Sequence, residues 1–224
     1  MVVESGAKRA NRLVAEVLDI IPNYTSGRGS FNSFPKLGYN ARHPSDWQRE
    51  FLQLLAPANL DSFGEHSGDI RGLVHFHNDL TLAQLPLPIY QSSDGSTQLF
   101  PVSLLSTTLG YALFEMVVRI LWTGGRDGPS SLDRLLMKFE SNCAIPELAI
   151  SLRRLNEAMI YAEDNGQSNL YRRLKKGRDQ LLHGNVLRAV EFEGSLLVLL
   201  IDLVVLHAIK DQLERQTGAT GCTP

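Results

Sequence analysis

The sequence predicts a mainly α-helical protein: an up-and-down helical bundle over about residues 101–215, with an N-terminal appendage of two helices and a small β element. Three observations lead to this prediction. Apolar residues recur at three- and four-residue spacing through most of the chain after Pro101. The polar or glycine-containing breaks between these segments are short, as in a compact bundle. A hydrophobic fraction of 43% and a formal net charge of −2 in 224 residues allow a sizeable core and argue against disorder.

Residues 1–100 form the appendage in this prediction. Apolar residues at helical spacing predict a helix over residues 5–21, which Pro22 would end. The stretch from 23 to 44 is rich in Gly, Ser, Asn and Pro and is expected to be a long loop. The segment PSDWQREFLQLLAP then predicts a short helix, with Ser45 as its cap. Its apolar face would consist of Trp47, Phe51, Leu54 and Leu55.

The β element is expected between residues 69 and 100. The segment DIRGLVHFH, residues 69–77, has the apolar texture of a strand. PIYQSSDGSTQLFP, which follows, contains the Asp-Gly pair typical of a hairpin turn between two short extended runs.

The bundle is expected to contain five helices. They are predicted at 101–122, 130–140, 146–164, 168–183 and 194–215, followed by a flexible tail at 216–224. Two of these helices are strongly apolar, but each carries charged or polar residues that would be costly in lipid. We therefore expect no membrane-spanning segment.

The expected compartment is the cytoplasm. Cys143 and Cys222 are far apart and lack a neighbouring CxxC pattern, which argues against a zinc site or a disulfide scaffold. The N-terminal residues carry charges throughout and do not resemble a secretory signal.

The segment YRRLKKGRDQLLHGN, residues 171–185, raises the question of function. On one helix, an apolar stripe is formed by Leu170, Leu174, Gly177 and Leu181. Gly177 within the stripe would let a neighbouring helix approach closely, at a cost of about 1 kcal/mol in helix propensity. The other side of the helix carries Arg172, Lys176, Asp179 and His183. The segment therefore predicts a helix with a buried apolar face, which includes Gly177, and a charged face on the opposite side.

Three residues of this helix could form a reactive site. Asp179 and His183 are four residues apart, so the carboxylate could orient the imidazole. Arg178 lies about 140° around the helix from His183. The two side chains would meet only if the arginine curls around the helix or if two copies of the helix face each other across a two-fold axis.

RDQLLHG, residues 178–184, resembles the arginine, polar residue and histidine signature of HEPN domains, which are helical bundles found in ribonuclease toxins, CRISPR effectors and other defence proteins. The resemblance covers about residues 101–215. It implies a metal-independent endoribonuclease without cofactors, in which Arg178 and His183 are catalytic and Asp179 takes the polar position. It also implies a homodimer with the site at its interface, a toxin or phage-defence role, and an antitoxin or defence-system protein as possible partner.

In that chemistry, the ribose 2′-hydroxyl attacks the adjacent phosphorus. Histidine suits proton transfer because its unperturbed pKa is about 6.5. The planar guanidinium of Arg178 suits the crowded phosphate oxygens. The neighbouring cations Arg172, Arg173, Lys175 and Lys176 would hold the RNA backbone.

Two alternatives stay open. The cationic helix could be a solvated face of a non-catalytic HEPN-like module that binds RNA, a nucleotide or a protein. In the second alternative, His75 and His77 share a face of the predicted strand and bind a metal together with Asp79, with His66 or Asp69 as further ligands.

Overall fold

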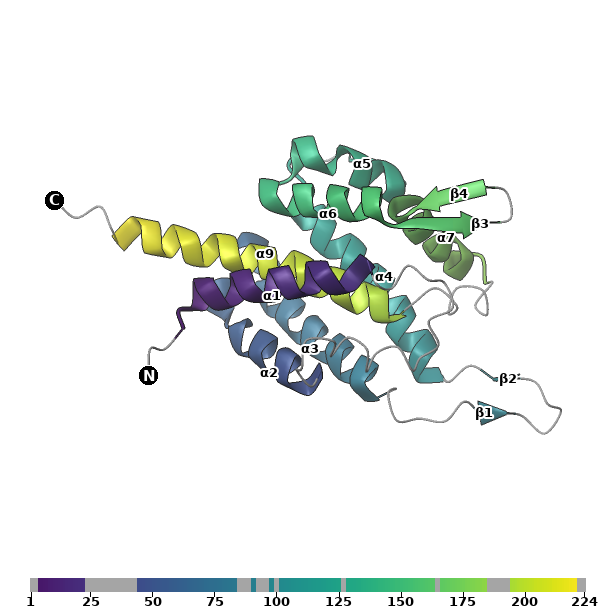
Figure 1. The fold of residues 1–224 in the computed structure, drawn as a ribbon, viewed down its shortest axis with the longest axis horizontal. Helices are drawn as coiled ribbons and strands as arrows, with labels where there is room; N and C mark the ends of the chain where they lie inside the picture. Colours follow the sequence, from purple (N-terminus) through teal and green to yellow (C-terminus); the bar gives the residue numbers. More distant parts are fainter. Residues whose placement is uncertain are drawn as a thin grey trace.

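The structure is a computed structural model that describes residues 4–22, 44–83, 90–91, 97–98, 101–125, 128–163, 166–184 and 194–220. It is mainly helical, as predicted (Figure 1). The first part of the chain contains α1 (Gly6–Ile20), α2 (Pro44–Leu54), the 3-10 helices η3 (Pro57–Asn59) and η4 (Asp61–His66), α3 (Ser67–Ala83), β1 (Tyr90–Gln91) and β2 (Thr97–Gln98). The second part contains α4 (Pro101–Ile120), α5 (Leu132–Asn142), α6 (Pro146–Ala158), β3 (Ile160–Glu163), β4 (Gly166–Asn169), α7 (Leu170–Leu182) and α9 (Gly194–Thr220).

The core is built around α9. Every residue of this helix from Leu196 to Ile209 is buried, which is the behaviour of a helix that is apolar on all sides. It packs against α1, α3, α4 and α6. In Figure 1, α1 and α9 lie side by side across the middle, with α2 and α3 on one side and α5 to α7 on the other.

Both halves of the chain contribute to a single hydrophobic cluster, which includes Leu13 of α1, Val74 of α3 and Leu174 of α7. The boundary near residue 100 stays a prediction from sequence. None of the described helices is both long enough and apolar enough to cross a bilayer.

Several predicted elements are confirmed. Helix α1 begins after Ser5, whose side chain accepts a hydrogen bond from the Lys8 amide. The predicted apolar face of α2 is largely buried, and Trp47 stacks on Phe51 with ring centroids 5.4 Å apart. Tyr90 pairs with Gln98 in the expected hairpin. The loop predicted over residues 23–44 lies outside the described residues up to residue 43, and Pro44 begins α2. Residues 92–96 of the hairpin turn also lie outside the described residues.

The strand predicted over residues 69–77 is wrong, because this segment belongs to α3. Over residues 67–80, where burial is described, the buried residues are Ile70, Val74, His77 and Asn78, which follow helical spacing. Two of the four are polar, so an inspection of apolar residues alone misses the helical period.

The helix predicted over 146–164 ends at Ala158 and is followed by the β3–β4 hairpin. The strands are antiparallel, with Ile160 opposite Asn169 and Tyr161 opposite Ser168. Gly166 begins β4 with a φ of 125°, a conformation that favours glycine. At the other end of the chain, α9 continues to Thr220, beyond the predicted end at 215.

Candidate functional site

Helix α7 is fixed in place by its N-terminus and by its buried face. The Asn169 side chain caps the helix by accepting a hydrogen bond from the Arg172 amide at 3.1 Å. Leu170 and Leu174 are buried in the core, while Leu181 is partly buried. These contacts give the charged side chains of α7 a defined direction.

Gly177 is the point where α7 meets α4. A Cβ atom added to Gly177 would lie 2.0 Å from the hydroxyl oxygen of Tyr111, a residue of α4. No side chain fits at that distance unless the structure shifts. The close contact predicted at Gly177 is therefore present, and it is made by the Tyr111 side chain of α4.

An array of alternating charges connects α7 with α4. The Asp179 carboxylate accepts hydrogen bonds from Lys175 Nζ at 2.6 Å and from Arg178 Nη2 at 3.1 Å. Arg178 Nη1 donates to Glu115 Oε2 of α4 at 3.0 Å. The other oxygen of Glu115 accepts from Arg119 Nη2 at 2.6 Å. Arg178 therefore lies between two carboxylates, with its side chain 17% exposed.

These contacts shift the proton affinities of the pair on α7. Burial alone would lower the pKa of Arg178, but the ion pairs with Glu115 and Asp179 outweigh it and raise the pKa. Burial pulls the pKa of Asp179 upward, whereas the hydrogen bonds from Lys175 and Arg178 bring that pKa below its ordinary value. Both groups are therefore charged at neutral pH.

His183 lies at the C-terminal cap of α7. Its backbone amide donates to the Asp179 carbonyl oxygen at 3.0 Å, and Gly184 follows with a φ of 75°. The side chain is exposed, and its imidazole forms no hydrogen bond with the residues that the structure describes. The hydrogen bond expected between Asp179 and His183 does not form, because Lys175 and Arg178 take the carboxylate.

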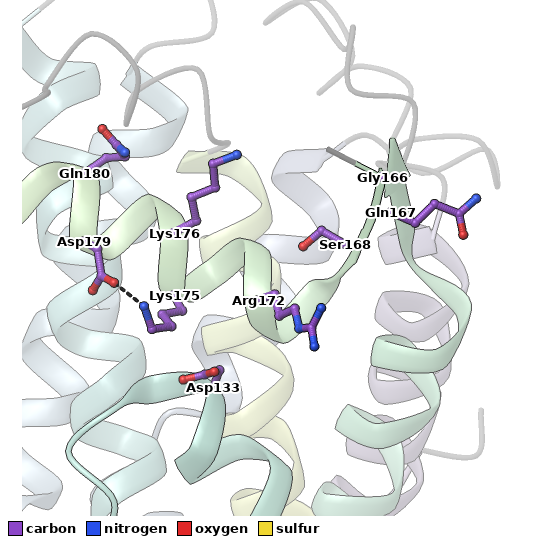
Figure 2. A pocket seen from close by; sticks show the side chains of 9 residues that line it. All are labelled: Asp133, Gly166, Gln167, Ser168, Arg172, Lys175, Lys176, Asp179 and Gln180. Atoms are coloured by element: carbon purple, nitrogen blue, oxygen red, sulfur yellow. Dashed lines mark hydrogen bonds and ion pairs between the residues drawn. The ribbon is translucent and has the colours of Figure 1, made fainter. Parts of the chain in front are cut away.

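A polar pocket of about 520 Å³ lies alongside α7. Its lining from α7 consists of Arg172, Lys175, Lys176, Asp179 and Gln180. The opposite wall is formed by Asp133 at the start of α5 and by residues 166–168 of β4. In Figure 2, the Lys175 ammonium turns toward Asp179, the Arg172 guanidinium lies between Asp133 and β4, and Lys176 projects from another side of the helix.

Three of the four cations predicted to hold RNA therefore line this pocket. The fourth, Arg173, points elsewhere: its guanidinium carbon lies 4.2 Å from the centroid of the Tyr161 ring, a cation–π contact. The contributions of Asp133, Gln180 and the hairpin residues were not predicted from sequence. The Asn-Gly pair at 165–166 is typical of a hairpin turn, and it was the sequence signal that could have predicted the β4 wall of the pocket.

The histidines proposed as metal ligands do not share a face. His75 and His77 lie on α3, where residues two apart point in nearly opposite directions. His77 is buried, and its Nε2 forms a hydrogen bond with the Ser106 carbonyl oxygen at 2.9 Å. Burial lowers the pKa of His77. Across the described ranges, no three His, Cys, Asp or Glu side chains are grouped so that they could hold a metal ion.

Comparisons of the chain with protein-family models, with curated proteins and with solved structures found no match.

Proposed function

We propose that this chain is a metal-independent endoribonuclease of HEPN type, with its site at the C-terminal end of α7. The observation that carries the proposal is the placement of the motif residues. Arg178 is held by two carboxylates, while an exposed imidazole lies at the end of the same helix. Asp179, which binds Arg178, also lines the polar pocket together with Arg172 and Lys175.

The proposed reaction is an attack of the ribose 2′-oxygen on the adjacent phosphorus. The bond from phosphorus to the 5′-oxygen breaks, leaving a 2′,3′-cyclic phosphate on one fragment and a 5′-hydroxyl on the other. His183 moves a proton at the 2′-oxygen or at the leaving oxygen. Arg178 has N–H donors beyond those that bind Glu115 and Asp179, and these would neutralise charge on the phosphate oxygens.

A second copy of the chain would complete the site. Arg178 is directed toward α4 by Glu115, and it lies about 140° around the helix from His183. In a two-fold dimer, Arg178 of one copy could approach the same phosphate as His183 of the other. Leu182, which is 73% exposed beside His183, supplies apolar surface for such a contact. A toxin or defence setting, with an antitoxin as partner, is part of this proposal.

The ion pairs of Arg178 favour a second candidate, a non-catalytic module that binds RNA, a nucleotide or a protein. An arginine that is only 17% exposed and bound to Glu115 would, in that case, hold α4 against α7. The pocket alone would then bind the ligand.

RNA cleavage in the presence of EDTA separates the two candidates. Mixed RNA is incubated with the wild-type chain, with His183→Ala and with Arg178→Lys, which keeps the charge but not the planar fork. His66→Ala is the matched control, because its side chain is exposed like that of His183 but belongs to η4. We expect chelator-resistant cleavage with cyclic phosphate ends, lost in both site variants and kept in the control.

Wild-type protein that is folded by circular dichroism and cuts no RNA would favour the binding module. Equal cleavage by His183→Ala and wild type would reject His183 as the proton carrier.

A further inference from the structure

The pocket beside α7 offers donors and acceptors to the same ligand. Arg172 is exposed, and its guanidinium forms no hydrogen bond or ion pair with the described residues. Lys175 already binds Asp179 at 2.6 Å, so this carboxylate is largely neutralised. The unmatched positive charge at the α7 side of the pocket therefore includes Arg172, whose planar fork suits a phosphate group.

Two acceptors also line the pocket: Asp133 at the start of α5 and Gln180 on α7. One oxygen of Asp133 accepts a hydrogen bond from the Ser131 hydroxyl; the other has no partner among the described residues. The Gln180 side-chain oxygen is buried and has no partner either. A buried acceptor without a donor is costly, and a bound ligand can supply that donor.

Inorganic phosphate alone does not fit this lining, because Asp133 would repel it and neither acceptor would receive a hydrogen bond. The lining matches a ligand that carries a phosphate together with hydroxyl and amino donors. A ribonucleotide has this combination, since its 2′-hydroxyl can donate to a carboxylate and its base can donate to an amide oxygen. The corresponding deoxyribonucleotide lacks the 2′-hydroxyl.

Size and position favour one unpaired nucleotide. A volume of about 520 Å³ lies within the range of small-ligand sites, and α5 and the β3–β4 hairpin flank the pocket (Figure 2). Asp179 both lines the pocket and binds Arg178 at 3.1 Å. A nucleotide held here would therefore be next to the phosphate that Arg178 contacts.

We propose that this pocket binds a single unpaired ribonucleotide of the RNA strand, with Arg172 on its phosphate, Asp133 on its 2′-hydroxyl and Gln180 on its base. The assignment to an RNA strand rests on the proposed function. The pocket would then select RNA over DNA by a direct contact, independently of the need for the 2′-hydroxyl in the reaction.

Binding by a protein that cannot cleave tests this inference. The His183→Ala chain is titrated into a short labelled single-stranded RNA and into the DNA of the same sequence, and fluorescence anisotropy gives both Kd values. We expect RNA to bind about ten-fold more tightly, the effect of one hydrogen bond to a charged group. Asp133→Asn in this background should bring the two Kd values close together, because the amide accepts the hydroxyl proton more weakly.

Arg172→Gln should weaken RNA and DNA binding alike and reduce the salt dependence of both. The control is Arg134→Gln, which removes an exposed cation of α5 that does not line the pocket. Both site residues are partly or fully exposed, so we expect these variants to fold, and circular dichroism checks this.

An unchanged ratio of RNA to DNA affinity in Asp133→Asn would overturn the inference. So would equal effects of Arg172→Gln and Arg134→Gln, or no RNA binding at all. If adenosine monophosphate displaces the RNA with a Kd equal to that of the oligonucleotide, the pocket would be assigned to a free nucleotide and not to a nucleotide of an RNA strand. If the wild-type protein cuts no RNA but prefers RNA over DNA in a way that depends on Asp133, the nuclease proposal would be rejected and the proposed nucleotide pocket would be kept.

Discussion

Asp202 of α9 is a carboxylic acid in the hydrophobic core, and replacing it with asparagine should stabilise the protein at neutral pH. The side chain has no solvent exposure. One of its oxygens accepts a hydrogen bond from Asn78 Nδ2 at 3.0 Å, and the other has no partner among the described residues. Burial raises the pKa of Asp202 to about 8, although the hydrogen bond from Asn78 opposes the change.

The sign of the effect follows from proton linkage. In the unfolded chain Asp202 would ionise near pH 4, whereas in the folded chain it stays protonated until about pH 8. Folding therefore takes up a proton between these values, and stability falls as pH rises. Each pH unit costs about 1.4 kcal/mol, so the penalty grows by about 3 kcal/mol between pH 5 and pH 7. Asp202→Asn removes this penalty and keeps the acceptor for Asn78.

Urea unfolding at pH 5, 6 and 7, followed by circular dichroism, measures the difference in free energy of unfolding between Asp202→Asn and wild type. We expect the difference to increase in favour of the variant by about 3 kcal/mol over this range. Asp202→Leu should share the pH slope, whatever its absolute stability, because it also removes the titration. Parallel curves for wild type and both variants would refute a protonated, buried Asp202.

Three further predictions concern stability. Burial lowers the pKa of His207 to about 4, so the unfolded chain takes up a proton that the folded chain does not. The free energy of unfolding should therefore fall as pH drops below 6.5, by about 2 kcal/mol at pH 5. In urea unfolding, His207→Gln should lose less stability over the same pH range. Gly177→Ala should lower the free energy of unfolding by about 1–3 kcal/mol through collision with Tyr111, and a stabilised variant would contradict this contact. Glu115→Gln should lower the free energy of unfolding by about 1–2 kcal/mol, because the charged acceptor of Arg178 is lost. Thermal melting measures this effect, and an unchanged midpoint would contradict a contribution of the ion pair.

The helices with apolar periods were predictable from sequence. Helix α1 shows apolar residues at helical spacing, α9 is a long apolar run, and Gly177 within an apolar stripe correctly indicated a close contact. Helix α3 was missed because His77 and Asn78 are polar yet buried. They form hydrogen bonds with groups of α3, α4 and α9, and the partners on α4 and α9 cannot be inferred from local spacing.

The candidate site was predictable only in part, for a similar reason. The motif residues are local in sequence, so Arg178 and His183 could be named from α7 alone. Glu115 lies 63 residues before Arg178, and Asp133 reaches the pocket through the packing of α5 against α7. Only tertiary structure brings these carboxylates beside the cations.

The packing of α1 against α9 has a consequence for synthesis of the protein. Ribosomes make α1 before α9, but α9 supplies most of the surface that packs against α1. In the nascent chain, the part of α1 that packs against α9 stays uncovered until translation has passed α9. Slow elongation or premature termination between the two helices should therefore yield chains that aggregate.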